Sequence, residues 1–328
     1  MVWIQFIVSA AVVVVAAVKL AEYGDAISVR TRLGGMFIGT LLMAGATSLP
    51  ELLTTISALG QNVPSLAVGN VFGSNMFNMF LLAVLDAVFW QARILRRVAT
   101  KHALTASLAV FIAAMSIFFI LADIDVRIGW VGLDSILLMV TYVAAVRLLQ
   151  GDSPRPATGA QDAAEIAGVP TLPWALVGFA AASGALVLAT PWLVRSSAGI
   201  AEITGLSTGF IGALLVAIVT SLPELTSVIA AVRLGAYDLA VGNLFGSNLF
   251  NVFILGITDV FYLPGRFLHI VDPAFALAGL LGLLLTALGL INNLVRAERR
   301  ILFVEVDALL LMLGYVGGMG FLYSRGIG

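Results

Sequence analysis

Long apolar runs fill most of this chain, and they limit the folds open to it more than any other feature of the sequence. Of the 328 residues, 61% are hydrophobic and only 11% are charged, about half the charged share of a soluble globular protein. Such a chain has too little polar surface to cover a folded globule in water, whereas apolar side chains can face lipid without penalty. The sequence therefore predicts an all-α integral membrane protein.

Charged residues, Pro and Gly interrupt the apolar runs and divide the chain into ten candidate transmembrane helices. A spanning helix needs about 20 apolar residues. The first run is too long for a secretory signal, so we expect a retained helix. The predicted spans are Val2–Leu20, Leu33–Leu59, Ser65–Phe89, Ala103–Ala122, Gly129–Leu149, Leu172–Val194, Leu206–Val232, Leu239–Tyr262, Pro273–Val295 and Ile301–Tyr323.

Lys and Arg are unevenly distributed between the two sets of predicted loops, which indicates the orientation of the chain. With the N-terminus outside, 13 of the 17 basic residues fall in inner connections and four in outer ones. We therefore expect both termini outside, in the inner or plasma membrane of the cell. Residues 150–171 form an inner, cytoplasmic linker that is too short for a folded regulatory domain. The net charge of −1 gives no basic surface for nucleic acid.

Two segments of the first half recur in the second half with one constant shift in numbering, called here the repeat offset, which aligns Glu51 with Glu224. TSLPEL at 47–52 recurs at 220–225, and LAVGNVFGSNMFN at 66–78 recurs as LAVGNLFGSNLFN at 239–251. The best-matched stretches are the polar ones. A decayed duplication would keep its lipid-facing pattern and lose its carboxylates, so we interpret both copies as functional.

The strongest match joins 44–86 to 217–259, where 23 of 43 positions are identical without a gap. Weaker matches extend further, so we expect a first five-helix repeat over 1–149 and a second over 172–328. Because five is odd, the second repeat must enter the membrane from the opposite face. Inverted repeats of this kind place a shared site near the middle of the bilayer, between the two copies.

Glu51 and Glu224 lie at equivalent positions deep within predicted spans. A charged side chain at this depth costs roughly 2.5–3.5 kcal/mol even on the most permissive insertion scale. No Lys or Arg lies deep in any span to compensate for these charges. The two glutamates therefore indicate either protonated carboxyl groups or bound cations, and the pairing favours cations.

Helical spacing places hydroxyl and amide groups on the same faces as these glutamates or on the helices that follow. All the expected ligands are oxygens, which hard cations prefer to nitrogen or sulfur. The chain has no Cys and only two His, so neither a thiolate site nor a histidine metal site is expected. The neutral residues expected at the site are Thr47, Ser48, Ser74 and Asn78 in the first half and Thr220, Ser221, Ser247 and Asn251 in the second.

Pro50 and Pro223 directly precede the two glutamates. Each removes the N–H that would bond to the carbonyl four residues earlier, at Ala46 or Val219. Freed carbonyls that face a cavity are good ligands for Na⁺ or Ca²⁺, although a plain proline kink is the alternative interpretation.

Both copies also carry a GxxxG spacing, at 69–73 and 242–246. This spacing predicts close helix packing, which would bring the third and eighth helices against the glutamate-bearing second and seventh. Asp86 and Asp259 lie near the ends of their spans, and we interpret them as solvated helix ends in preference to a vestibule for cations.

The doubled motif resembles the two α-repeats of the cation/calcium exchanger superfamily, and most closely its sodium/calcium exchanger branch. The resemblance implies an antiporter, not an enzyme, with ten helices in two inverted repeats. It implies no cofactor, Na⁺ and Ca²⁺ as transported ions, a lipid bilayer around the chain and no obligatory protein partner. An electrogenic three-for-one exchange would follow, with the first and sixth helices sliding across the other eight.

The resemblance also assigns ion ligands, position by position. Calcium would be held by Glu51, Glu224, Thr47 and Thr220. Sodium would be held by the same glutamates, by Ser48, Ser74, Ser221 and Ser247, and by backbone carbonyls near Ala44 and Ala217. Asn78 and Asn251 would complete the site. In the potassium-dependent branch an Asp is found where this chain has Asn251, so a potassium requirement is not expected.

Three alternatives remain at this point. The first keeps an antiporter but replaces Na⁺ with H⁺, or Ca²⁺ with Mg²⁺. The second is a cation channel with the glutamates as its filter, although channels usually assemble such rings by symmetry around one pore. The third is an intramembrane hydrolase. This chemistry needs paired Asp residues in the core or a Ser partnered by His, and neither is expected in this chain.

Overall fold

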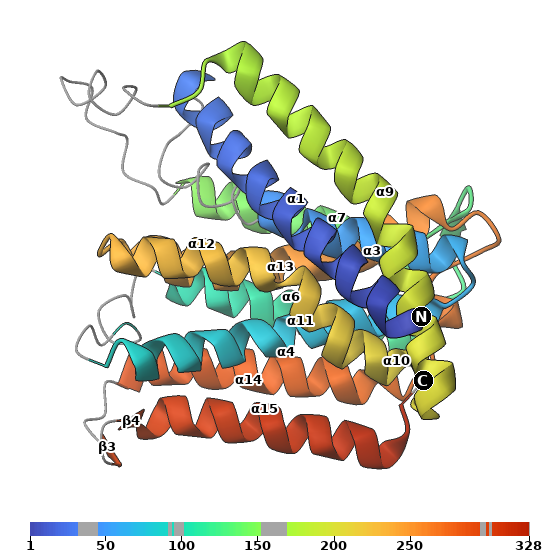
Figure 1. Ribbon diagram of the computed structural model, residues 1–328. Coiled ribbons are helices and arrows are strands. Elements are labelled where there is room, and N and C mark those ends of the chain that lie inside the picture. Colours follow the sequence, from blue (N-terminus) through green and yellow to red (C-terminus); the bar gives the residue numbers. More distant parts are fainter. Residues whose placement is uncertain are drawn as a thin grey trace.

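The computed structural model describes residues 1–31, 45–90, 94, 102–151, 169–295, 300–301 and 304–327. Within these residues the chain is almost entirely helical, and its helices form an elongated bundle (Figure 1). The first half contains α1 (Val2–Thr31), α3 (Leu49–Gly60), α4 (Pro64–Val88), α6 (Ala103–Ala122), β1 (Arg127–Ile128), β2 (Val131–Gly132) and α7 (Leu133–Gly151). The second half contains α9 (Leu172–Thr204), α10 (Thr208–Ile211), the π-helix η1 (Gly212–Val216), α11 (Ala217–Thr220), α12 (Leu222–Arg233), α13 (Tyr237–Phe261), the 3₁₀ turn η2 (Leu268–Ile270), α14 (Phe275–Val295), β3 (Arg300–Ile301), β4 (Val304–Glu305) and α15 (Val306–Arg325).

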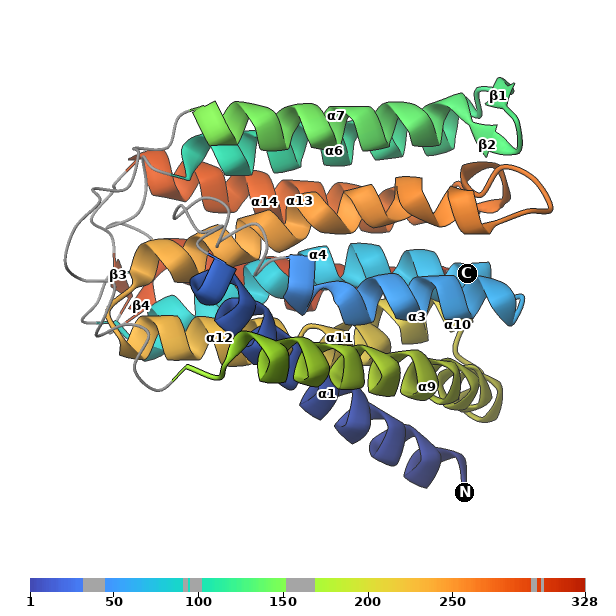
Figure 2. The ribbon, with the colours of Figure 1, turned by 90° about the horizontal axis from the view of Figure 1, so that it is seen from above.

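In the described part of the chain, six helices are long and apolar enough to cross a membrane, namely α1, α4, α6, α9, α13 and α15. The segment from α10 to α12 adds a seventh if its bent halves count as one span. Helices α3, α7 and α14 run along the same direction of the bundle (Figure 2) but do not meet the same test. The chain is therefore a helical membrane protein with six or seven spans by this measure, and the number ten stays a prediction.

Helix α1 continues past its predicted end at Leu20 to Thr31. Its charged residues do not end it, because Lys19 and Glu22 form an ion pair of 2.6 Å on the exposed surface of the helix. A helix of this length measures about 45 Å, more than the ~30 Å thickness of the hydrocarbon core. Helix α1 accordingly lies obliquely across the bundle, beside α9 (Figure 1).

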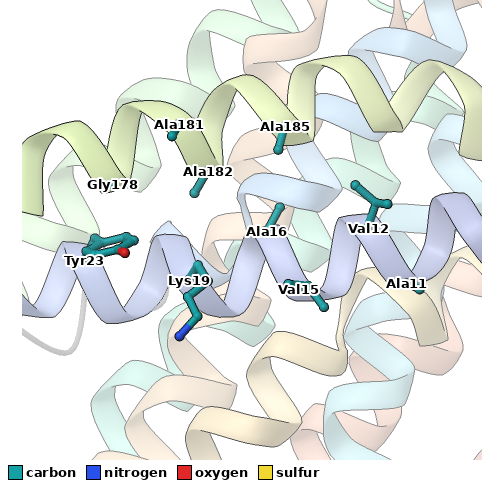
Figure 3. Close-up of a pocket in the computed structure, with 10 residues that line it drawn as sticks. All are labelled: Ala11, Val12, Val15, Ala16, Lys19, Tyr23, Gly178, Ala181, Ala182 and Ala185. Carbon is teal, nitrogen blue, oxygen red and sulfur yellow. The ribbon is translucent and has the colours of Figure 1, made fainter.

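Helices α1 and α9 leave a groove of about 490 Å³ between them. Figure 3 shows Ala181, Ala182 and Ala185 of α9 facing α1, while Lys19 points away from α9. The groove is lined mainly by Ala, Val and Gly and offers no carboxylate or amide oxygen to a cation. This space is therefore not the candidate cation site.

Helices α4 and α13 form the centre of the bundle. The most apolar segments of α4 and α13 are 78% and 72% buried, whereas those of α1 and α9 are only 33% and 22% buried. Helices α6 and α7 of the first half pack against α13 of the second half, and α14 and α15 pack against α4 of the first. Each half thus covers the central helix of the other half.

Aromatic side chains pack at the places where a helix of one half covers the central helix of the other half. Tyr142 of α7 packs against Phe250 and Phe253 of α13, with ring centroids 5.8 and 4.5 Å apart. A second cluster has the same composition and is related to the first by the repeat offset. It consists of Tyr315 of α15 with Phe77 and Phe80 of α4, at 6.0 and 4.8 Å.

Two short hairpins occur at equivalent sequence positions in the two halves. Strands β1 and β2 pair antiparallel with Arg127 opposite Gly132, and strands β3 and β4 pair with Arg300 opposite Glu305. The repeat offset relates these pairs as well, although the two hairpins lie at opposite ends of the bundle (Figure 2). Both chain termini lie at the end that carries the β1–β2 hairpin (Figure 2).

The prediction of solvated carboxylates at Asp86 and Asp259 is wrong, because both side chains are buried. The Asp259 carboxylate accepts hydrogen bonds from the backbone N–H of Gly132 at 2.7 Å and of Phe267 at 2.5 Å. Asp259 of the second half therefore anchors the hairpin of the first half. Two-residue strands have no periodicity that a sequence pattern can detect, so this contact was not anticipated.

Arg266 lies in the connection between α13 and α14, but its side chain is only 4% exposed. It pairs with Asp123 at 2.8 Å and with the buried Asp134 at 3.6 Å, and it donates to the Ile124 carbonyl. Hydrogen bonds from His269 and Arg266 hold the pKa of Asp123 below its ordinary value. These contacts tie together the connections at the end of the bundle that carries the β1–β2 hairpin.

The glycine spacing of the first repeat produces the predicted close packing. A Cβ atom at Gly69 would lie 2.2 Å from the Gly209 carbonyl oxygen, and one at Gly73 would lie 2.3 Å from the Ala213 carbonyl oxygen. Helix α4 therefore touches the backbone of α10 and η1, in the predicted seventh span. For the 242–246 spacing, much of the expected partner helix, 32–44, lies outside the described residues.

We expect Gly73→Ala to lower the free energy of unfolding by about 1–3 kcal/mol, because the methyl group must force two backbones apart. Gly184→Ala is the matched control, since a Cβ atom there meets nothing within 4 Å and alanine favours a helix by up to ~1 kcal/mol. Thermal unfolding of both variants in detergent measures the difference. Equal melting temperatures for the two variants would contradict the close approach of α4 and η1.

Candidate cation site

Each of the two glutamates follows a break in its helix. Ser48 and Ser221 leave the helical conformation, with ψ angles of 8° and 5°. The break at Ser221 bends the segment from α10 to α12 by 41°. Glu51 and Glu224 consequently lie in the first turns of α3 and α12, where the positive end of the helix dipole stabilises a carboxylate.

The two glutamates are held by serines from the opposite half of the chain. Ser48 donates to Oε1 of Glu224 at 2.9 Å, and Ser221 donates to Oε1 of Glu51 at 3.1 Å. The bonds are reciprocal, so the helix breaks of both halves meet at one place. Each buried carboxylate is therefore held beside the helix break of the other half.

Serines of the central helices α4 and α13 also contact the Oε1 atoms of the two glutamates. Ser74 of α4 lies 3.4 Å from Oε1 of Glu51, and Ser247 of α13 lies 3.4 Å from Oε1 of Glu224. Each Oε1 atom is therefore a shared acceptor for two hydroxyl groups. All of these side chains are fully buried.

The second carboxylate oxygens, Oε2 of Glu51 and of Glu224, are buried without a hydrogen-bond partner. Among the described Lys, Arg and His side chains, none forms an ion pair with either glutamate. Uncompensated buried carboxylates are costly. A cation placed between the Oε2 atoms would remove this cost, because it would balance the charge and supply the missing contacts.

Amide groups extend the same arrangement by one helical turn. Asn78 of α4 donates to Oδ1 of Asn248 at 3.0 Å, and Asn251 of α13 donates to Oδ1 of Asn75 at 3.0 Å. The Oδ1 atoms of Asn78 and Asn251 remain buried without partners. The site thus contains two carboxylate and two amide oxygens with no donor assigned to them, as a ligand set for a hard cation requires.

The described residues contain no cluster of three or more His, Cys, Asp or Glu side chains that could hold a metal. A cation at this place would therefore rely on two carboxylates supplemented by neutral oxygens. This donor set excludes soft metals and suits Na⁺ or Ca²⁺.

One neighbouring contact differs between the halves. Asn70 of α4 accepts a hydrogen bond from Thr220 at 3.0 Å and donates to the Glu51 carbonyl at 3.4 Å. Its repeat equivalent, Asn243 of α13, is buried with neither side-chain atom bonded. The second half of the site is therefore arranged differently from the first half.

The remaining predicted ligands are placed as follows. Thr47 and Thr220 are fully buried beside the helix breaks. The Ala217 carbonyl accepts the backbone N–H of Ser221 at 3.0 Å and thus takes part in the helix. Ala44 lies outside the described residues.

Asn70, Asn75, Asn243 and Asn248 belong to the site but were not singled out in the sequence analysis. Their recurrence at the repeat offset, within the motif GN…GSN, was the available signal. Thr286 of α14, which accepts a hydrogen bond from Asn248 at 3.2 Å, carries no such signal because the equivalent residue is Ala113.

Comparison with known proteins identifies the family of this chain. The profile of a family described as "Sodium/calcium exchanger protein" matches the chain twice, over residues 1–149 and 174–324. The putative antiporter CaxA of Alkalimonas amylolytica is 30% identical over 303 residues, which cover 88% of each chain.

Two solved exchangers have similar folds. The structure of the H⁺/Ca²⁺ exchanger CAX matches with a TM-score of 0.67 and 14% identity, covering 99% of this chain and 89% of the other. The sodium-calcium exchanger NCX_Mj, soaked with Na⁺, matches with a TM-score of 0.61 and 19% identity, covering 98% and 100%. The fold of the bundle is therefore that of known exchangers, and the chain belongs to the sodium/calcium exchanger protein family.

Proposed function

We propose that this protein is an antiporter that exchanges Na⁺ for Ca²⁺ across the membrane by alternating access. The observation that carries the proposal is the pair of buried, unpartnered carboxylate oxygens at Glu51 and Glu224. Membership of an exchanger family supports transport over catalysis. The transported ions are the substrates, and no cofactor takes part.

The proposed architecture has ten spans in two inverted repeats, 1–149 and 172–328, with the 150–171 linker between them. Three observations support it. The family profile matches each half separately, the equivalent hairpins lie at opposite ends of the bundle (Figure 2), and each glutamate bonds to a serine of the other half. The strongly repeated motifs, 44–86 and 217–259, then meet near the middle of the bilayer.

In the proposed site, Ca²⁺ lies between the Oε2 atoms of Glu51 and Glu224, with oxygens of Thr47 and Thr220 as further ligands. Sodium ions use the same carboxylates together with neutral oxygens. The proposed sodium ligands are Ser48, Ser74, Ser221, Ser247, Asn78, Asn251 and the backbone carbonyls near Ala44 and Ala217. The buried neutral oxygens near the carboxylates would supply ligands for more than one small ion.

Charge balance would couple the two ions. The empty site carries about −2, which one Ca²⁺ neutralises and which several Na⁺ can neutralise in its place. A neutral, occupied site crosses the low-dielectric interior at lower cost than an empty charged one. A three-for-one exchange would move one net charge per cycle, worth roughly 2.3 kcal/mol at 100 mV.

Alternating access is proposed to come from α1 and α9, which lie together at one side of the bundle (Figure 1). Helix α9 is the least buried of the long helices and α1 is as little buried as α15, and both α1 and α9 contact the bent segment that carries Glu224. The asymmetry between Asn70 and Asn243 is consistent with one half of the site being closed while the other is open.

The proposed orientation places both termini outside, in the inner or plasma membrane. The charge distribution supports it, because 13 of the 17 basic residues fall on the opposite side. The structure is consistent with this topology, since the termini share one end of the bundle (Figure 1).

We expect an outward-directed sodium gradient to drive ⁴⁵Ca uptake into proteoliposomes that contain the purified protein. Glu51→Gln and Glu224→Gln should each abolish this uptake, because an amide cannot supply the charge that Ca²⁺ requires. Glu202→Gln, at an exposed position on α9, is the matched control and should transport normally. Thermal unfolding in detergent checks that all three variants fold.

The same preparation distinguishes the competing functions. Uptake that follows a pH gradient and ignores the sodium gradient would assign H⁺ coupling instead. Passive flux without counter-transport would indicate a channel. Normal uptake by both Gln variants would contradict the central role of the carboxylate pair.

We expect Asn251→Asp to change the ion selectivity of transport. The substitution adds a third carboxylate next to a site that already carries two, so it should favour additional monovalent cations and create a response to K⁺. Uptake of ⁴⁵Ca measured against Na⁺ with and without K⁺ tests this expectation. Identical dependence on Na⁺, K⁺ and Ca²⁺ before and after substitution would place Asn251 outside the site.

A further inference from the structure

The two amides that present oxygens to the candidate cation site, Asn78 and Asn251, are not supported in the same way. An amide carries an oxygen at one end and an NH₂ group at the other, and its hydrogen-bond partners decide which end points where. Asn78 offers an oxygen to the site only because its NH₂ group is used elsewhere, as a donor to Oδ1 of Asn248 at 3.0 Å. The orientation of Asn248 therefore determines what Asn78 presents to an ion.

Asn248 is oriented by two acceptors. Its NH₂ group donates to the Asn75 backbone carbonyl at 3.3 Å and to Oγ1 of Thr286 at 3.2 Å. The carbonyl can only accept. The Thr286 hydroxyl donates its own proton to the Gly282 carbonyl at 2.8 Å, so toward Asn248 it is an acceptor as well. Both contacts thus require the NH₂ end of Asn248 to face α14 and α4.

The surroundings of Thr286 hold this arrangement in place. Thr286 and Asn248 are only 3% and 2% exposed, so water cannot substitute for the missing partners. Helix α14 is packed against α4 here, because a Cβ atom at Gly282 would lie 3.6 Å from Cβ of Asn75, an ordinary van der Waals contact. An inverted Asn248 would bring its oxygen against two acceptors in a confined space, which is unfavourable.

In the first half, the equivalent position carries no hydroxyl group that could orient an asparagine. The residue equivalent to Thr286 at the repeat offset is Ala113, which has no hydroxyl group. No hydroxyl of α6 at that position can therefore orient Asn75, the repeat partner of Asn248. The chain departs from its internal symmetry at the position that orients one of the two site amides.

We propose that Thr286 is a positioning residue for cation binding. It holds Asn248 in the orientation that makes Asn78 donate away from the site, and Asn78 consequently presents Oδ1 to the ion. The proposal rests on the proposed function, in that it takes the unpartnered Oδ1 of Asn78 as part of the cation site.

The test uses the full-length protein with CaCl₂ and, separately, NaCl as ligands, measured as ion-dependent thermal stabilisation in detergent. We expect Thr286→Val to weaken the apparent affinity for these ions ~10-fold, since it removes one buried acceptor of Asn248. Thr286→Ser keeps the hydroxyl and should restore the wild-type affinity. Thr258→Val is the matched control, because Thr258 is a buried threonine that bonds to its own helix at the Ile254 carbonyl.

A double-mutant comparison separates positioning from packing. If Thr286 acts through Asn78, Thr286→Val should have no further effect on affinity in an Asn78→Ala background. An equal loss in both backgrounds would overturn the proposal, as would a change in melting temperature without a change in affinity. Failure of the proposed function is distinguishable, since it would appear as absent sodium-driven ⁴⁵Ca uptake in the wild type. If neither salt stabilises the wild type, Asn78 faces no ion and the inference is wrong.

Discussion

Two carboxylates without a basic partner, enclosed where the halves of the chain meet, are the constraint on which the rest of this structure depends. Each is held through one oxygen by serines, and the other oxygen has no partner. In a membrane interior this arrangement is stable only with a proton or a cation present. The helix breaks at Ser48 and Ser221 place both carboxylates at helix N-termini, where the local dipoles also favour negative charge.

The surrounding fold keeps this site compact. Close backbone contact at Gly69 and Gly73 seats α4 against the segment that leads to Glu224. Each half covers the central helix of the other half, with Tyr142 packed on α13 and Tyr315 packed on α4, and these contacts link the halves. Asp259 adds a further link by binding the backbone of the other half's hairpin. Neither half of the chain could form the site alone, because each half supplies the serine that holds the glutamate of the other half.

The sequence was sufficient for the membrane class and the family, and it singled out the glutamates and serines that bond between the halves. Helical spacing placed Ser48 on one face with Glu51, but the helix breaks at Ser48, and spacing within a helix carries no information about partners on another helix. It therefore could not predict that Ser48 bonds to Glu224 instead of Glu51. The error at Asp259 has a related cause, since the hairpin that buries it has strands of only two residues. Thr286 was missed because the repeat pointed to identical residues, whereas Thr286 acts where the two copies differ.

The hydrogen bonds between the halves also restrict how access to the site can alternate. Hydrogen bonds to charged groups contribute about 1.5–3 kcal/mol each, and rocking one half against the other would break the serine–glutamate and Asn–Asn bonds together. Helix α9 has fewer such ties, because the buried hydroxyls of Ser196 and Ser197 bond to carbonyls of their own helix. A sliding motion of α1 with α9 would leave the reciprocal bonds intact and would exchange mainly apolar contacts at an exposed side of the bundle. For the alternating access proposed above, the lower-cost route is therefore movement of this pair over a site whose own geometry is preserved.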